Sequence, residues 1–435
     1  YGILSIVILV LISYKGFALQ IIRDDETELF MHSLANNLLK SAGQPQNSLN
    51  IYLAINKEFN AFVFPGRNLV MNTGTIINSS YLMVAGIMAH EIGHIAAGHL
   101  QLQALANQNY QLQRIAGLIT GGILLASGIP EGATAAISAS EHAALMQRLK
   151  HSRRDETMAD NLAIRFLAQT SINPNGMREA MQYLARYQRL QSSATNSYLY
   201  THPLSTERLS NISLALQKYD TDSLSYNNSS EREFASIKAK LSAYLLGNTQ
   251  LMQAELNRDF GFSEANDYWR AILLYRRHQH KKAEEVASRI SDEHPNNPYI
   301  YELRAQIAAG YKDLNASVKF YEKALALLPK AIIMKIDAAR VAIMQNNLSG
   351  LQKAITWLEQ VMAVERDNLM AIRQLVTAYG KLGKMGEAYY WQAEEQIIIS
   401  KPIEARKFIE KAEPLLVGNS IYLAKLNDLK KLALN

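Results

Sequence analysis

Residues 81–100 read YLMVAGIMAHEIGHIAAGHL, an apolar run with two histidines and a glutamate in its second half. The pattern is typical of a helix over Tyr81–Leu100. Positions four residues apart lie on one face of a helix, so His90 and His94 can turn both imidazoles toward one point. Two such nitrogens can bind one Zn²⁺ at about 2.0–2.1 Å. The segment therefore predicts half of a zinc site, carried on one helix.

Glu91 follows the first histidine and can reach a water molecule in the open coordination position of such a zinc ion. Zinc lowers the pKa of that water and polarises the carbonyl group of a peptide bond. The carboxylate can then take the proton and deliver it to the leaving amine. An HExxH string arises by chance in a chain of this composition about one time in a hundred. We interpret it as a metallopeptidase motif; the alternative is two histidines that serve only helix packing.

A catalytic zinc site needs a third protein ligand. A histidine six residues beyond the motif is excluded because position 100 is Leu, and His99 is expected to point off the shared face. A carboxylate from a second helix is the other solution, and Glu156 offers it. Asp160 lies one turn after Glu156 and can hold the distal N–H of a ligating histidine. The competing ligands are Glu141, His142, His151 and Asp155, each of which could instead be a solvated helix residue.

HEIGH, followed sixty-two residues later by Glu156, Ala159 and Asp160 as ExxAD, resembles the HtpX and CAAX-prenyl-endopeptidase group of gluzincin metallopeptidases. The resemblance covers nearly the whole chain beyond its N-terminal segment. It implies an α+β, mainly α fold: a gluzincin metallopeptidase domain with a small β-hairpin or sheet, followed by an α-helical tetratricopeptide-repeat solenoid. It also implies a zinc metalloendopeptidase with one Zn²⁺ per chain.

The same resemblance assigns roles to single residues. His90, His94 and Glu156 correspond to the metal ligands, and Glu91 corresponds to the general base. Asp160 corresponds to a proton donor, although an ionised carboxylate is a poor donor and an orienting role suits it better.

Two further stretches support the resemblance. Asn60–Gly66 (NAFVFPG) is similar to the family's NAF…PGG hairpin, whose edge strand lies by the cleft, and Arg67 stands where a second glycine is usual. A substrate could pair as an added strand with Ala61–Phe64 or Leu69–Met71. Thr201–Leu204 (THPL) with Arg208 is similar to the THPL…R segment. The resemblance implies that His202 approaches the metal as a fourth, inhibitory ligand; the alternative is a loop histidine.

The C-terminal half repeats with a helical pattern. Small residues and prolines recur 34 residues apart, as in the pairs Ala271 and Ala305, Ala283 and Ser317, and Pro295 and Pro329. This period resembles the tetratricopeptide repeat, and we count about four copies, with the copy near 332–367 out of register. The alternative is a helical domain without repeats.

The N-terminal segment and the absence of cysteines suggest that the protein is exported. Gly2–Ser13 is almost wholly apolar and only about twelve residues long, which suits a secretory h-region better than a spanning helix. The predicted domains are therefore a signal peptide (1–18), a metallopeptidase domain (19–216), a linker (217–233) and a repeat domain (234–435). A retained anchor stays open. Export of a 435-residue chain without cysteines fits a bacterial periplasm.

The expected partners follow from the resemblance. It implies action on unfolded, misassembled or stalled outer-membrane β-barrel proteins, with the repeats as a docking surface for the β-barrel assembly machinery. A chaperone or docking scaffold with proteolysis secondary is the alternative function, and peripheral membrane association stays open. The basic run 276–282 has no interleaved aromatics, so no nucleic-acid partner is expected. The glycine-rich stretch 115–140 suggests a mobile lid or a packing surface.

Overall fold

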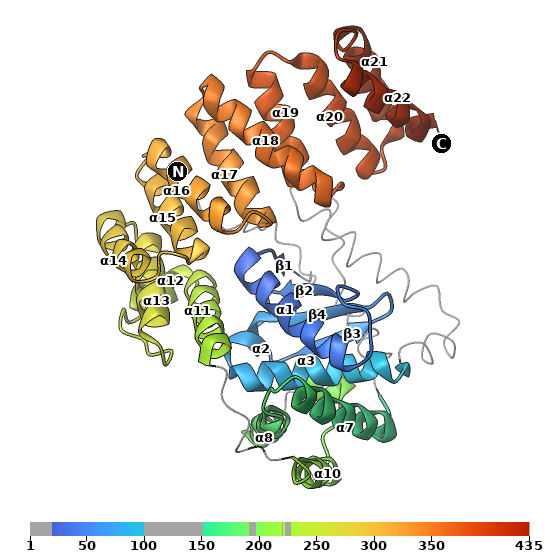
Figure 1. Cartoon of the computed structure of the whole chain (residues 1–435), viewed down its shortest axis with the longest axis vertical. Helices are drawn as coiled ribbons and strands as arrows, with labels where there is room; N and C mark the ends of the chain where they lie inside the picture. Colours follow the sequence, from blue (N-terminus) through green and yellow to red (C-terminus); the bar gives the residue numbers. More distant parts are fainter. Residues whose placement is uncertain (1–19, 100–150, 191–196, 220, 222–227, 435) are drawn as a thin grey trace. The chain divides into compact units, whose positions relative to one another are not determined.

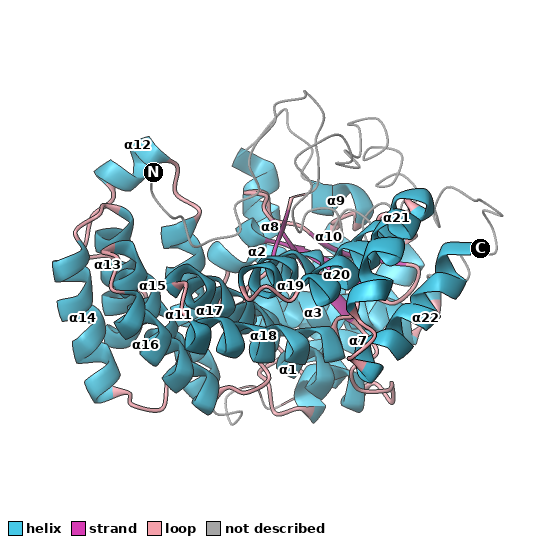
Figure 2. Cartoon of the chain, turned by 90° about the horizontal axis from the view of Figure 1, so that it is seen from above, coloured by secondary structure: helices cyan, strands magenta, loops and turns pink. Residues whose placement is uncertain are grey.

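A computed structural model describes residues 20–99, 151–190, 197–219, 221 and 228–434 (Figure 1). The predicted fold class is confirmed: the chain is mainly helical, with a small four-stranded sheet near its N-terminus and a helical repeat region later in the sequence. Figure 2 shows how few strands there are among the helices. No helix within the described ranges is long and apolar enough to cross a membrane. The predicted signal peptide, the stretch 115–140, Glu141 and His142 lie outside those ranges.

The sheet contains β1 (Ile21–Ile22), β2 (Asn50–Ala54), β3 (Ala61–Phe64) and β4 (Asn68–Asn72) in the order β1-β2-β4-β3. β3 and β4 form an antiparallel hairpin, and β4 pairs parallel with β2. Because β4 lies between two partners, the idea that Leu69–Met71 offers a free edge is wrong. Among the described strands on this side, β3 is the edge.

The turn between β3 and β4 explains why an arginine can replace the second glycine. Gly66 and Arg67 both adopt positive φ angles, 93° and 58°. A non-glycine residue in this region is strained. The Arg67 guanidinium compensates by donating to the Ser48 carbonyl oxygen at 3.0 Å and to the Ser48 hydroxyl at 2.8 Å.

The helices that carry the site are α3 (Tyr81–Ala96), α7 (Arg153–Gln169) and α10 (Thr206–Leu216). The remaining helices of this part are α1 (Asp25–Ser41), α2 (Thr73–Ile77), α8 (Asn175–Leu190), α9 (Ser197–Thr201), α11 (Asn228–Tyr244), α12 (Asn248–Gln253). The prediction that the central helix continues to Leu100 is wrong. It ends at Ala96, because Gly98 adopts a φ of 74°, the left-handed conformation that terminates helices.

Glycines let α3 touch two other helices at backbone distance. A Cβ atom on Gly93 would lie 2.8 Å from the carbonyl oxygen of Ala159 on α7. A Cβ atom on Gly176 of α8 would lie 2.0 Å from the carbonyl oxygen of Leu82. Neither contact is possible for a side chain. These crossings therefore fix α7 and α8 against α3, and the first places Glu156 one turn from Ala159, beside the HExxH face.

The chain forms two compact units, which divide between Trp269 and Arg270. The first unit keeps α11, which begins at Asn228, inside the predicted linker, and packs Phe234 against Phe30 and Tyr81. The predicted domain bounds stay a proposal; by backbone contacts, the first unit extends beyond residue 234.

The second unit consists of antiparallel helix pairs. Its first helices, including α13, which crosses the division, are α13 (Ser263–Arg276), α15 (Pro298–Gly310), α17 (Ile332–Gln345), α19 (Leu369–Lys381) and α21 (Pro402–Ala412). Their partners are α14 (His280–Glu293), α16 (Leu314–Leu327), α18 (Leu348–Val364), α20 (Met385–Ile398) and α22 (Ser420–Leu434). α15 and α17 start 34 residues apart, whereas α17 and α19 start 37 apart because α18 is longer. This extra turn accounts for the copy that the sequence placed out of register.

Candidate active site

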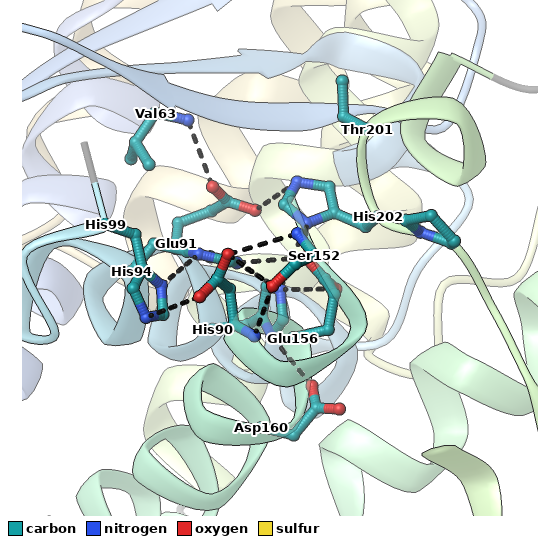
Figure 3. Close-up of polar contacts among 12 residues, drawn as sticks. Val63, His90, Glu91, His94, His99, Ser152, Glu156, Asp160, Thr201 and His202 are labelled. Carbon is teal, nitrogen blue, oxygen red and sulfur yellow. Dashed lines mark hydrogen bonds and ion pairs between the residues drawn. The ribbon is translucent and has the colours of Figure 1, made fainter. Parts of the chain in front are cut away.

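Four buried side chains, three from two helices and one from the loop after a third helix, converge on one point. His90 and His94 come from α3 and Glu156 from α7, while His202 follows α9 directly. Each offers one ligand atom, and these atoms lie within 4.8 Å of one another. The Nε2 atoms of His90 and His94 face each other at 3.0 Å, and Glu156 oxygens lie 3.5 Å and 3.4 Å from them. Figure 3 shows the side chains pointing inward at this centre.

These spacings fit a metal ion. Ligands at about 2.0–2.1 Å around a tetrahedral zinc are separated from one another by roughly 3.3 Å. The His202 Nδ1 atom lies 3.3 Å from His90 Nε2 and 2.9 Å from Glu156 Oε1, so the fourth corner has the same dimensions. The His90 Nδ1 atom lies 2.8 Å from the Asp160 carboxylate, so a neutral His90 carries its proton there and turns the lone pair of Nε2 toward this centre. The donor set, three imidazoles and a carboxylate, is one that zinc prefers.

Asp160 and Arg208 support two of these ligands. The Asp160 carboxylate lies 2.8 Å from His90 Nδ1 and accepts from Arg208 Nε at 2.6 Å. Arg208 Nη1 lies 2.6 Å from the Glu156 carboxylate. Burial opposes charge on Glu156, but His202, Arg208 and His90 outweigh it and hold the pKa of Glu156 well below its ordinary value. Burial also opposes charge on His90, yet Glu156 and Asp160 raise the pKa of that imidazole to about 9.

Glu91 points into the same centre from α3. Its Oε2 accepts from the backbone N–H of Val63 on β3 at 3.1 Å, and its Oε1 lies 3.4 Å from His202 Nε2. Burial raises the pKa of the Glu91 carboxyl, although the neighbouring histidines counteract it. A carboxylate whose proton affinity is raised by burial is well suited to accept a proton.

The His94 side is built from two further histidines. His99 Nδ1 lies 2.9 Å from His94 Nδ1, on the side of that ring away from the four-ligand group, so His99 lies off the ligand face as expected and still contacts a ligand. The reason is that α3 ends before residue 99, and Gly98 turns the chain back. His151 stacks on the His94 ring with centroids 3.8 Å apart. Burial lowers the pKa of His151 to about 3.

The competing ligand residues that the structure describes stand outside the four-ligand group. His151 stacks on the rings of His94 and His202, and Asp155 lies 3.5 Å from His99, so both border the group without belonging to it. Sequence reasoning gave Arg208 no role of its own, although the THPL…R spacing contained the signal. Tyr198, which stacks on His202 with centroids 4.5 Å apart, was missed entirely.

Comparisons with known proteins agree with this geometry. A family model described as peptidase family M48 matches residues 25–215. A protein of Vibrio cholerae named putative beta-barrel assembly-enhancing protease is 23% identical over 93% of this chain and 83% of its own length. The beta-barrel assembly-enhancing protease of Escherichia coli K12 is 25% identical over 72% of this chain, and the match spans 64% of that relative.

Two other matches cover 42% and 75% of this chain. Metalloprotease LoiP of Escherichia coli K12 is 28% identical over 42% of this chain and 66% of its own length. Among solved structures, yeast Tom70 aligns with 75% of this chain and 64% of its own, at 16% identity and a TM-score of 0.27.

Proposed function

We propose that the chain, a metalloprotease whose residues 25–215 match the model of peptidase family M48, is a zinc-dependent endopeptidase of the periplasm. Its proposed substrates are misfolded or stalled outer-membrane β-barrel proteins. The names of the relatives support this substrate class, since several are called beta-barrel assembly-enhancing proteases.

The observation that carries the proposal is the convergence of His90, His94 and Glu156 beside Glu91. The three candidate ligand atoms come from two helices that cross at Gly93 and Ala159, where no side chain fits between the backbones. A rigid crossing holds the ligands at metal distance, and Asp160 and Arg208 fix two of them from behind. We assign one Zn²⁺ per chain to this centre.

The residues then divide the chemistry between them. Zinc, when bound, polarises the peptide carbonyl and lowers the pKa of a water molecule. Glu91 accepts the proton of the attacking water and delivers it to the leaving amine. Asp160 keeps the His90 ring oriented through Nδ1 and stays ionised, because Arg208 overcomes the effect of burial and lowers the pKa of Asp160. The proton-donor role assigned by family resemblance therefore suits Asp160 less well than this orienting role.

His202 acts as a latch in this proposal. Its Nδ1 fills the fourth corner of the ligand set, and its Nε2 approaches Glu91. A substrate carbonyl needs that corner, so the arrangement is a closed state. Replacing His202 by Ala opens the corner, and we expect faster cleavage. Unchanged cleavage would remove the latch and leave the peptidase assignment in place.

Substrate would enter along β3. The Val63 N–H on β3 donates to Glu91, so this edge strand lies directly beside the catalytic carboxylate. A strand added there is held through its backbone, with little selection of side chains. This suits unfolded, strand-rich substrates.

Zinc content and cleavage of an unfolded protein test the proposal. Purified protein should hold about one zinc per chain and cleave casein, and the His202→Ala form guards against a latched enzyme with weak activity. The Glu91→Gln variant should keep its zinc and lose cleavage, because only the proton acceptor is gone. Cleavage by Glu91→Gln at the wild-type rate would overturn the mechanism.

The helix pairs of the second unit favour a second function, a chaperone or docking scaffold for the β-barrel assembly machinery. Genetic complementation distinguishes the scaffold function from the proteolytic function. If Glu91→Gln restores outer-membrane integrity in a strain that lacks the protein, the scaffold is the main function. If only the catalytically active form restores outer-membrane integrity, proteolysis is the main function.

A further inference from the structure

The His94 ring has two nitrogens, and only one of them faces the proposed zinc. Nε2 points to His90 and Glu156, at 3.0 Å and 3.4 Å. Nδ1 points the other way, to His99 Nδ1 at 2.9 Å. A neutral imidazole that binds metal through one nitrogen carries its proton on the other. The His94 Nδ1–H therefore needs an acceptor, and within the described residues His99 stands at that distance.

His99 is arranged to be that acceptor. The Asp155 carboxylate lies 3.5 Å from His99 Nε2, which favours the His99 proton on Nε2 and leaves a lone pair on Nδ1. Asp155 is itself fixed, because it forms a reciprocal capping box with Ser152 at the start of α7. The same first turn of α7 carries Glu156. One helix start thus holds a metal ligand and, through Asp155 and His99, orients a second one.

The two zinc-binding histidines therefore have different partners behind them. His90 is backed by the carboxylate of Asp160 at 2.8 Å, whereas His94 is backed by an imidazole. Such partners fix the ring and the tautomer of a ligating histidine, and their loss typically weakens metal binding by about 10- to 100-fold.

A second metal ion among His94, His99 and His151 is a weaker reading. The ligand atoms of these residues lie within 4.8 Å of one another. The His94 and His151 rings, however, are stacked at an interplanar angle of 28°, so their in-plane lone pairs run nearly parallel and do not converge. His94 would also have to bind metal ions through both ring nitrogens. A hydrogen bond between His94 and His99 requires neither converging lone pairs nor a second metal ion.

We propose that His99 is a positioning residue: its Nδ1 accepts the His94 Nδ1–H and holds that ring in the orientation and tautomer that bind zinc. The proposal rests on zinc ligation by His94 and so deepens the proposed function. Gly98 is part of the device, since its left-handed conformation brings His99 back over His94.

Zinc affinity tests this directly, without reference to cleavage. The affinity of the full chain is measured by competition with a chromophoric chelator for wild type, His99→Ala and His99→Asn. Asn places an acceptor oxygen the same number of bonds from Cβ as His Nδ1. We expect His99→Ala to bind zinc about 10- to 100-fold more weakly and His99→Asn to regain most of the loss. Unfolding of the metal-free proteins should be alike.

Two control variants distinguish the positioning role of His99 from zinc ligation by His94. His94→Ala should lose zinc, and retention there would overturn the ligand assignment itself. His278→Ala, in an exposed turn of the second unit, should match wild type. If His94→Ala loses zinc while His99→Ala binds like wild type, the positioning role is wrong. It is also wrong if Ala and Asn are equally weak, since ring packing would then be responsible. Two zinc ions per chain, falling to one in His99→Ala, would replace it by the second-metal reading.

Discussion

Arg208 shows how one residue can stabilise a site without touching substrate. Its guanidinium lies between two buried carboxylates, at 2.6 Å from both Glu156 and Asp160. Removing one partner of a buried charge group costs more than the group contributes when complete, because the remaining charges stay buried and uncompensated. Arg208 therefore keeps the acidic half of the site ionised and folded.

The residue-scale prediction concerns Arg208→Ala. We expect the first unit of the metal-free protein to lose about 3–5 kcal/mol of unfolding free energy, measured by denaturant titration. The unfolding free energy of Arg208→Lys should lie between those of wild type and Arg208→Ala, because an ammonium group keeps the charge but not the planar, forked geometry of the guanidinium. Arg186→Ala, on an exposed position of α8, is the control. If Arg208→Ala unfolds like Arg186→Ala, the carboxylates do not depend on this pairing.

The residues of the centre differ in how far the sequence could predict them. The i, i+4 spacing of His90 and His94 carries its own geometry, since any helix brings them together. Glu156 required the ExxAD resemblance, because no local pattern tells which distant helix crosses the motif. The contact of His99 with His94 was not predicted, because it depends on where α3 ends and on the left-handed conformation of Gly98.

The crossing of α3 and α7 turns sequence motifs into a site. Gly93 and Ala159 are the small residues of HEIGH and ExxAD, and they meet where the backbones touch. The two small residues take no part in the chemistry, but their contact sets the distance between the metal ligands on α3 and α7.

Gly93→Ala tests that crossing. The added methyl group would lie 2.8 Å from the Ala159 carbonyl oxygen, so α7 must move and carry Glu156 away from the histidines. We expect loss of most zinc affinity and a lower unfolding temperature. Gly380→Ala is the matched control, since the space around Gly380 on α19 is open and alanine suits a helix interior. Equal zinc binding by both variants would show that the close contact is not required.

A buried charge cluster beside α1 gives a second prediction at the scale of elements. Lys240 of α11 lies 2.5 Å from Asp24 and 3.2 Å from Glu26, and the Tyr268 hydroxyl donates to Glu26 at 3.1 Å. Burial raises the pKa of Glu26 to about 7, although Lys240 opposes it. The folded state therefore binds this proton more tightly than the unfolded state, where the pKa is near 4.5.

The sign of the pH effect follows from linkage. The Glu26 contribution is complete below about pH 4.5 and declines as pH rises toward 7, by at most about 1.4 kcal/mol per pH unit. Glu26→Gln, which resembles the protonated form, should flatten this part of the stability profile. Thermal unfolding of metal-free protein at several pH values measures it, with the exposed Glu255→Gln as control. A Glu26→Gln profile parallel to wild type would refute the assignment.

At the scale of the whole molecule, the proposed metal centre lies entirely in the first unit. The second unit has its own polar network near its end, where the Tyr422 hydroxyl meets the Glu359 carboxylate at 3.1 Å and the Tyr379 hydroxyl at 3.0 Å. Trp391 Nε1 donates to the same Tyr422 oxygen at 3.1 Å. This network ties the last helix, α22, to the helix pairs before it.

Tyr422→Phe should therefore affect one unit only. Loss of a buried hydroxyl that serves three partners should lower the stability of the second unit by about 1–3 kcal/mol. Zinc affinity should stay at the wild-type value. Tyr311→Phe, at a tyrosine that is 45% exposed, is the control for unfolding. A loss of zinc affinity in Tyr422→Phe would mean that the two units do not fold separately.

The repeat region could be predicted from the sequence because its helix pairs recur at a fixed period. The extent of the first unit could not be predicted in this way. The 34-residue recurrence of small residues indicated paired helices because each pair must solve the same packing problem. The polar composition of 217–233 indicated a linker, yet α11 begins inside it. Composition reports solvent exposure, whereas the extent of a unit depends on which residues, such as Phe234, pack into which core.

X-ray absorption at the zinc edge tests the central claim most directly, because it reports the atoms around the metal. For zinc-loaded His202→Ala protein, we predict nitrogen and oxygen neighbours at about 2.0–2.1 Å and the scattering pattern of two imidazoles. Wild type should show one imidazole more. Adding Glu156→Gln should abolish stoichiometric binding. A bound zinc whose spectrum is the same with Glu156 or with Gln at that position would contradict the account.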